Sequence, residues 1–372
     1  MTVISRRSVL AGAVVAAPFI LTRRGRAADL RQVTFTLPWV AEGSNAYAYV
    51  AKAKGFWEQR GLDVQISRGY GSTAAAQAVG AGQFQFGLAA ASAGIQEAAK
   101  GLPVKAILSC GYDATMGVCV LKDGPIHTVK DLEGHKMAST VNSGDYPFLP
   151  LFSQKAGFDL DKVERVQADP NVRQRLLITK DVDAISGFAI SFLPVFETQN
   201  VEARNLLYSS SGLTLYNNSL LTQVSLVDKE PQLCAAVAAG LADALKFSML
   251  EPDEAVQLFL KQVPEVALSP KGADRIRLGL GILNVSMLYK QMQEHGVGYA
   301  VPKDYEGNTS PIKTTKRRTK LRSLPTTSLA NSNLLKANGT RRWPTPNRSA
   351  ISWRRKHGNG RVHSRRSRQE NL

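Results

Sequence analysis

Two turns rich in glycine and serine have the composition of small-anion sites. Gly69, Gly71 and Ala74 form a GxGxxA pattern that follows a run of β-forming residues and opens an alanine-rich helix. Glycines let a ligand approach the backbone, and the free amides after Ser72 favour a carboxylate, sulfonate or phosphate at the helix N-terminus. Ser72 can also act as a plain helix cap, and the two roles can coexist.

The same pattern does not predict a dinucleotide site. The turn follows the second predicted strand rather than the first, and no acidic residue stands about 20 positions later to hold a ribose. We therefore expect this turn to bind a small polar group, with Thr73 beside Ser72.

A second turn of this kind, Val141 to Gly144, also precedes a predicted helix. Paired helix N-termini on two lobes would let one small polar ligand bridge both lobes and favour closure. Flat apolar walls are a common feature of ligand pockets, and four aromatic residues near predicted strand ends could supply them, although core packing is the alternative for each. The predicted ligand-binding residues are Trp39, Asn45, Ser72, Thr73, Ser92, Tyr112, Asn142, Ser143, Phe188 and Tyr216.

Residues for catalysis or metal binding are sparse. The five histidines stand apart from any recognisable nucleophile turn, and neither HExxH nor GxSxG occurs. The three cysteines, Cys110, Cys119 and Cys234, form no CxxC and no cluster with histidine. The sequence therefore predicts no catalytic residue, no metal and no cofactor. We expect the cysteines to be buried as small apolar residues. Formation of one disulfide in an oxidising compartment is the alternative.

Strand-like and helix-like segments alternate along the part of the chain that must position these turns. The predicted strands are 33–37, 63–66, 84–88, 104–109, 118–121, 136–140, 163–167 and 183–188. The predicted helices are 46–54, 72–79, 92–100, 145–155, 229–250, 254–261, 273–283 and 287–295. This alternation indicates an α/β fold with mainly parallel sheets flanked by helices.

We interpret the chain as two α/β lobes joined by crossing strands. Residues 28–115 form the first part of lobe I, 116–212 form lobe II, and 213–306 complete lobe I with helices. The carboxyl ends of the strands, where open α/β sheets usually bind ligands, would then face one cleft.

The high net charge of +17 is unevenly distributed. Residues 307–372 contain 17 of the 47 Lys and Arg and a single acid, whereas residues 28–306 hold 25 bases against 29 acids. Low hydrophobicity with high charge predicts a tail that cannot fold alone. A shifted reading frame would produce such a tail; a natural segment for nucleic acid or anionic lipid is the alternative.

The first 27 residues have the features of a twin-arginine export signal. Arg6 and Arg7 precede a short apolar run, and small residues follow it, with cleavage expected after Ala27. The apolar run is too short to span a bilayer comfortably. The alternative is a buried N-terminal helix. We expect the mature protein to begin near Ala28 in the periplasm.

The segment WVAEGSNAYAYVAKAKGFWEQRGLDV (39–64) resembles the opening of periplasmic solute-binding proteins of the nitrate, sulfonate, taurine and thiamine-pyrimidine-precursor group. The likeness continues through 79–107 and 128–138 and covers roughly residues 33–300. The resemblance implies a two-lobed type II binding protein that delivers a small molecule to an ABC permease and its ATPase in the inner membrane.

The same fold occurs in hydroxymethylpyrimidine phosphate synthase, an enzyme that uses pyridoxal phosphate and iron. That resemblance implies a cofactor-holding Lys and an active-site His at positions that are Ala89 and Ala93 in this chain. The synthase's early His is Asn45, and its cysteine-rich run has no counterpart in LYNNSL (215–220). Alanine can neither form a Schiff base nor move a proton, so the synthase is the alternative function and a non-enzymatic binding protein is expected.

The expected function is capture of a small polar or anionic solute by a monomeric protein that does not bind nucleic acid. Sulfonate, nitrate, aromatic acid and pyrimidine-type ligands all remain open.

Overall fold

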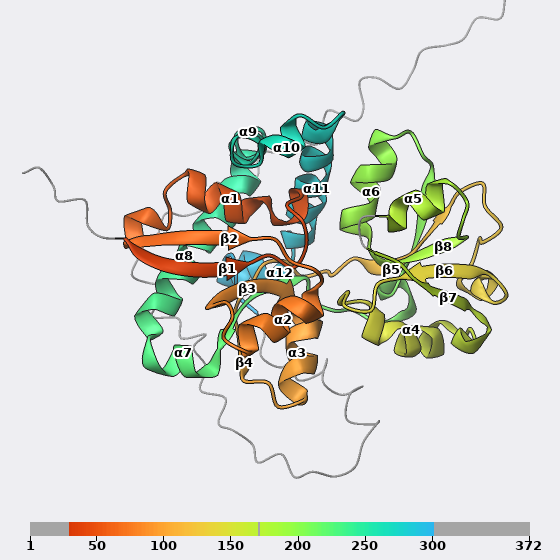
Figure 1. Ribbon diagram of the computed structural model, residues 1–372, viewed down its shortest axis with the longest axis horizontal. Helices are drawn as coiled ribbons and strands as arrows, with labels where there is room; N and C mark the ends of the chain where they lie inside the picture. The colour runs from red at the N-terminus through yellow and green to blue at the C-terminus, as the bar shows by residue number, and fades with distance from the viewer. Residues whose placement is uncertain (1–29, 170–171, 301–372) are drawn as a thin grey trace, which may run out of the picture. The chain divides into compact units, whose positions relative to one another are not determined.

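The computed structural model describes residues 30–169 and 172–300 and contains two five-stranded sheets (Figure 1). The predicted export signal and the basic tail lie outside the described residues. The predicted lobe boundaries at 115/116 and 212/213 fall between strands of different sheets.

Each sheet has its own strand order from edge to edge. The lobe I sheet is β2 (Leu62–Ser67), β1 (Arg31–Thr36), β3 (Phe86–Ala90), β10 (Asn218–Gln223) and β4 (Val104–Ser109). The lobe II sheet is β7 (Glu164–Gln167), β6 (Lys136–Ser139), β8 (Ala184–Phe188), β5 (Met116–Leu121) and β9 (Ala203–Leu207).

The two sheets share one topology: both are mixed, and in each of them four of the five strands run in the same direction, in agreement with the predicted mainly parallel sheets. β1 runs parallel to β2 and β3, and β6 runs parallel to β7 and β8. β10 and β5 run antiparallel to both of their neighbours. These two strands follow the passages of the chain between sheets, so no crossover helix within their own sheet sets their direction. The two lobes are therefore joined by two passages of the chain, one from β4 to β5 and one from β9 to β10.

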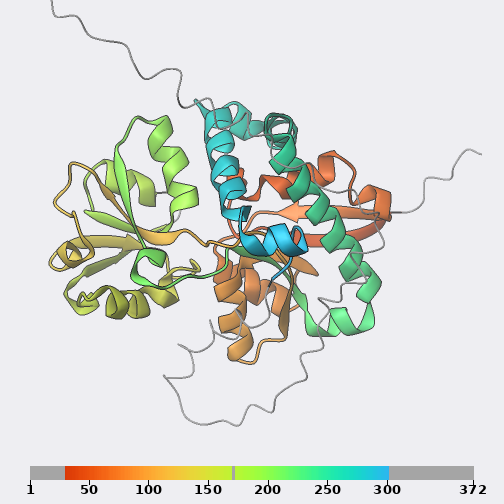
Figure 2. The same ribbon diagram turned by 180° about the vertical axis from the view of Figure 1, so that it is seen from behind.

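The helices connect successive parallel strands and then cover lobe I (Figures 1 and 2). Within the sheets the connecting helices are α1 (Ala46–Ala53), α2 (Ser72–Gly80), α3 (Ala91–Ala99), α4 (Leu149–Ala156), α5 (Arg173–Ile178) and α6 (Ala189–Thr198). After β10 come α7 (Val224–Lys229), α8 (Pro231–Leu250), α9 (Pro252–Gln262), α10 (Pro264–Ala267), α11 (Gly272–Met287) and α12 (Lys290–His295).

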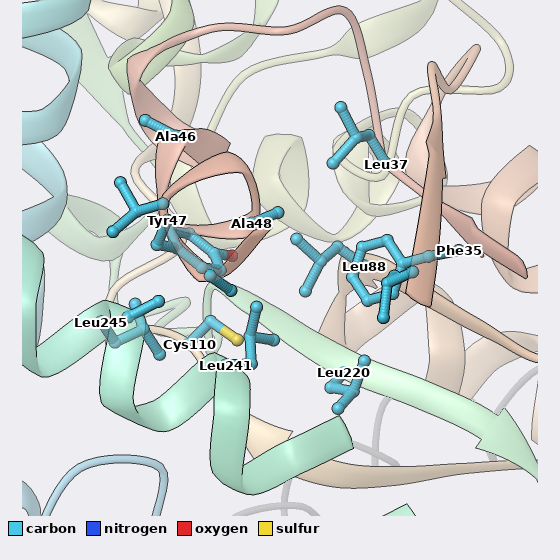
Figure 3. Packing of buried hydrophobic residues seen from close by; sticks show 14 of the residues in the cluster. Phe35, Leu37, Ala46, Tyr47, Ala48, Leu88, Cys110, Leu220, Leu241 and Leu245 are labelled. Carbon is cyan, nitrogen blue, oxygen red and sulfur yellow. The ribbon is translucent and has the colours of Figure 1, made fainter. Parts of the chain in front are cut away.

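The central strands are buried on both faces, and neighbouring residues contact different helices. In β10, Leu220 joins the cluster formed with α1 and α8 (Figure 3), whereas Leu221 joins the cluster on the α2 side. In β5, Val118 packs with the α4 residues, and Cys119 packs with the α5 and α6 residues. Double burial explains why these strands read as nearly continuous apolar runs.

Helix α8 lies against the core of lobe I. It is long and apolar enough to cross a membrane by length and composition, but its residues Val237, Leu241 and Leu245 are fully or almost fully buried in the core cluster. Trp57, 1% exposed, donates a hydrogen bond from Nε1 to the Val237 carbonyl at 3.0 Å. We therefore describe α8 as a core helix.

The Trp57 contact leaves no room for a side chain at Gly240. A Cβ atom there would lie 2.3 Å from the indole ring, whereas one at Gly281 in α11 would meet nothing within 4 Å. We expect Gly240→Ala to lower the free energy of unfolding by about 1–3 kcal/mol through overpacking. Gly281→Ala should raise it by up to about 1 kcal/mol through helix propensity. Urea denaturation of both variants tests this, and equal effects would contradict the assigned contact.

All three cysteines are free and buried. Burial raises the pKa of Cys110 and of Cys119 to about 12, and that of Cys234 to about 11. Figure 3 shows Cys110 among Tyr47, Leu241 and Leu245. A thiol in such surroundings is not ionised at neutral pH and is inert.

We expect a thiol reagent at pH 8 to leave the native protein unlabelled and to label three cysteines in urea. The reason is that both access and ionisation require unfolding of the core. Mass spectrometry counts the labels. Fewer than three in urea without a reductant would show that a disulfide forms.

Candidate functional site

A narrow cavity lies where strand ends of the two sheets meet. Lobe I contributes residues from the loop after β1, the start of α2 and the start of β10. Lobe II contributes residues from the turn before α4, from α5, and from the end of β8 into α6. The lining residues are Pro38, Trp39, Glu42, Ser44, Ser72, Ser143, Arg173, Phe188, Ile190, Ser191, Asn217 and Asn218.

The loop after β1 carries Trp39 and Glu42 and is held by its own polar contacts. Asn45, fully buried, donates from Nδ2 to the Val40 carbonyl at 2.9 Å and accepts from the Glu42 amide at 3.1 Å. A Cβ atom at Gly69 would lie 2.0 Å from the Leu37 carbonyl oxygen, so the two loops touch through backbone. Asn45 therefore shapes the loop and does not line the cavity.

Glu42 joins the two lobes. Its Oε1 accepts a hydrogen bond from Ser44 at 2.6 Å and another from Ser191, in α6 of lobe II, at 2.7 Å. Burial raises the pKa of Glu42, and the two serines and the charge of Arg173 act against that rise.

Arg173 begins α5 and is 2% exposed. Its guanidinium carbon lies 4.9 Å from the Phe192 ring centre and 5.8 Å from that of Trp39, which belongs to lobe I. Its Nη1 donates to Thr140 Oγ1 at 3.4 Å, and its Nε is buried with no hydrogen-bond partner in the described chain. Burial lowers the Arg173 pKa, while the carboxylates of Asp145 and Glu42 raise it.

Asp145 lies behind the cavity wall and is fully buried. Its Oδ1 accepts a short hydrogen bond from Ser143, and within the described residues its Oδ2 has no hydrogen-bond partner. Burial raises the pKa of Asp145, and Arg173 opposes that rise most strongly. Two buried carboxyl groups thus flank one buried guanidinium.

The two predicted anion-binding turns contact each other directly. The Thr73 amide donates to the Asn142 carbonyl at 3.2 Å, and a Cβ atom at Gly71 would lie 2.1 Å from that oxygen. Ser72 Oγ accepts from the Ala90 amide at 3.1 Å. In this conformation the turns seal one side of the cavity rather than bracket a ligand, because the protein itself uses these groups.

Four of the ten predicted residues line the cavity: Trp39, Ser72, Ser143 and Phe188. Thr73 and Asn142 form the contact between turns, and Ser92 is buried in α3. The rings of Tyr112 and Tyr216 pack edge to face, with 5.8 Å between their centres, in a separate cluster with Met287, and the Tyr112 hydroxyl donates to the Tyr299 carbonyl. For each of the ten residues, a role in ligand binding stays a prediction.

Sequence reasoning did not select the charged residues or the asparagines of the cavity. Glu42 and Ser44 lie in the 39–45 loop, of which only the end residues, Trp39 and Asn45, were predicted to bind ligand. Asn217 and Asn218 lie in the segment LYNNSL (215–220). Arg173 stands at the start of α5, which is the lobe II counterpart of α2 and of its Ser72. Aligning the two lobes by topology is the signal that would have found it.

The family described as NMT1/THI5 like matches residues 44–255, more than half of the chain. The chain belongs to the NMT1/THI5-like family. Among curated relatives of this family member, the riboflavin-binding protein RibY of Chloroflexus aurantiacus is 22% identical, over 73% of this chain and 77% of RibY. The 4-amino-5-hydroxymethyl-2-methylpyrimidine phosphate synthase THI11 of Saccharomyces cerevisiae is also 22% identical, over 74% of this chain and 86% of its own.

Solved structures confirm the fold of this NMT1/THI5-like protein. The alkanesulfonate-binding protein SsuA of Xanthomonas axonopodis pv. citri, bound to MOPS, superposes with a TM-score of 0.53 at 18% identity, covering 68% of this chain and 85% of SsuA. The fold is that of a type II periplasmic binding protein, as the sequence predicted.

The residues of the cavity do not fit the cofactor chemistry of a synthase. Ala89 and Ala93 are 0% and 1% exposed and carry neither an amine nor an imidazole. The described residues that line the cavity include no lysine and no histidine, so they offer no group for a Schiff base. Within 30–169 and 172–300, no group of three His, Cys, Asp or Glu could hold a metal ion.

The serine pair on Glu42 provides a test of the contact between lobes. Ser191→Ala removes a hydrogen bond to a carboxylate, worth about 1.5–3 kcal/mol, across the lobes, whereas Ser44→Ala removes one within lobe I. We expect Ser191→Ala to lower the fraction of molecules whose two lobes are in contact roughly tenfold. Ser44→Ala should change that fraction less. Distances between spin labels at Lys155 and Lys229, both exposed, measure that fraction. Equal distance distributions in both variants would contradict a lobe contact through Glu42.

Proposed function

We propose that this protein is the substrate-binding component of an ABC importer, which captures a small, partly flat, polar solute in the periplasm. The cavity that both lobes line carries this proposal. Trp39 and Phe188 offer aromatic surface, and Glu42 and Arg173 offer buried charged groups that fix orientation. The names of relatives such as RibY support ligand binding.

Binding in this proposal acts by stabilising the closed arrangement of the lobes. A solute that contacts Arg173 and Ser143 on one side and Glu42 and Ser72 on the other gains most of its contacts only when the lobes meet. Such a ligand shifts the population toward the closed form by its differential affinity for it. The Ser191–Glu42 hydrogen bond adds to the same state.

The solute leaves this protein chemically unchanged. The lining residues offer hydroxyls, amides, one guanidinium and one carboxyl group, with no lysine, histidine or cysteine among those described. We propose that the closed protein is recognised by a permease and its ATPase in the inner membrane, and that the protein acts as a monomer after twin-arginine export.

A ligand screen on the purified full chain tests the function. Sulfonates, nitrate, aromatic acids and pyrimidines are added in turn, and the melting temperature is recorded, since a ligand that binds only the native state raises it. Calorimetry then gives the affinity of each hit, and mass spectrometry checks that the recovered compound is unaltered. Turnover of a hit, or no hit in any class, would contradict the proposal.

Variants place the bound compound in the cavity. Trp39→Ala and Arg173→Lys are expected to weaken binding of a hit at least tenfold, because they remove a flat wall and the planar guanidinium fork. Leu268→Ala, at a side chain that is 86% exposed and outside the cavity, is the matched control and should leave affinity unchanged. Unchanged affinity in both cavity variants would place the ligand elsewhere.

A further inference from the structure

The charge around the cavity is already balanced without a ligand. Among the described residues, the charged side chains of the lining are Glu42 and Arg173, and the buried carboxyl group of Asp145 interacts electrostatically with Arg173. A buried guanidinium with no counter-charge is costly, so at least one of the two carboxyl groups is ionised. The cluster therefore carries a net charge of zero when one is ionised and of −1 when both are.

Three backbone amides close to the cavity are already used within the protein. The amide of Thr73, at the N-terminus of α2, donates to the Asn142 carbonyl of the other lobe. The Ala90 amide, just before α3, donates to Ser72 Oγ, and the Ala91 amide donates to the Asn217 carbonyl. Protein acceptors thus already use these three donors, which are then not available to a sulfonate or carboxylate.

Hydrogen-bond donors and a hydrogen-bond acceptor of the cavity remain available to a ligand. Asn217 Nδ2 belongs to a cavity-lining residue and is buried with no hydrogen-bond partner in the described chain, as is Arg173 Nε. Both atoms are donors and need an acceptor. The Glu42 carboxyl group, which belongs to lobe I like Asn217, collects two serine donors on Oε1 and is an acceptor when ionised. Buried polar atoms without partners cost free energy, which a matching ligand would recover.

We infer that the natural ligand has no net negative charge: it is a planar neutral or zwitterionic molecule that accepts hydrogen bonds from Arg173 and Asn217 and donates one to Glu42. This inference rests on the proposed function and narrows its ligand class. A simple monoanion would add an uncompensated negative charge beside Glu42 and would bring no hydrogen-bond donor beyond the two serines that this carboxyl group already has.

Matched probes that differ in charge test the inference. Nicotinamide is compared with nicotinate, and uracil with orotate, by calorimetry on the full chain. We expect each neutral member to bind the wild type at least tenfold more tightly than its anionic partner. Glu42→Gln removes the negative charge and should narrow that ratio at least tenfold. Glu202→Gln, at an acid 74% exposed on the surface, is the matched control and should leave the ratio unchanged.

The charge of the tightest ligand in the wider screen is a second readout that needs no variant. A neutral or zwitterionic compound at the top supports the inference. An anion at the top, or an anionic probe that binds the wild type as tightly as its partner, overturns it while the binding function stands. If no compound of either set binds, the proposed function itself is wrong, and the inference is wrong with it.

Discussion

The balance of charge around Arg173 is the constraint on which the site depends. A guanidinium that is 2% exposed needs carboxylates nearby, and the structure supplies one from each lobe: Asp145 from lobe II and Glu42 from lobe I. Because Glu42 also accepts from Ser191, the same group that balances the charge ties the lobes together. Charge compensation and lobe contact are thus one arrangement, and it sets what a ligand must bring.

Much of the fold could be predicted because its elements obey simple patterns. Strands buried on both faces, such as 116–121, read as continuous apolar runs, and the alanine-rich helices follow them closely. Three of the elements that escaped prediction break those patterns, whereas β9, α7 and α10 also escaped it and contribute no residue to the cavity lining. β10 begins with Asn218 and Ser219, α5 is a six-residue helix that starts with Arg173, and α6 carries Pro194 in its interior. All three elements supply polar side chains to the cavity, so the departures from local propensity coincide with the site.

The site itself was only partly accessible from the sequence. Turn composition pointed to Ser72 and Ser143, and aromatic type pointed to Trp39 and Phe188, and all four line the cavity. The charged group could not be found in this way, because its members are distant in sequence and only the folded sheets bring them together. The same limit explains the turns of 69–73 and 140–145, whose direct contact fills the space that their composition had suggested for a ligand.

The path of the chain through the two sheets has a consequence for biosynthesis. Lobe II is built from one continuous stretch, whereas β10, which separates β3 from β4, is made only after lobe II is complete. Until then β3 lacks one of its two strand partners, the edge strand β4 has no partner in the sheet, and the α8 face of the sheet is uncovered. During translation lobe II can fold before lobe I is complete. Lobe I folds last, because its strand β10 is synthesised about a hundred residues after β4.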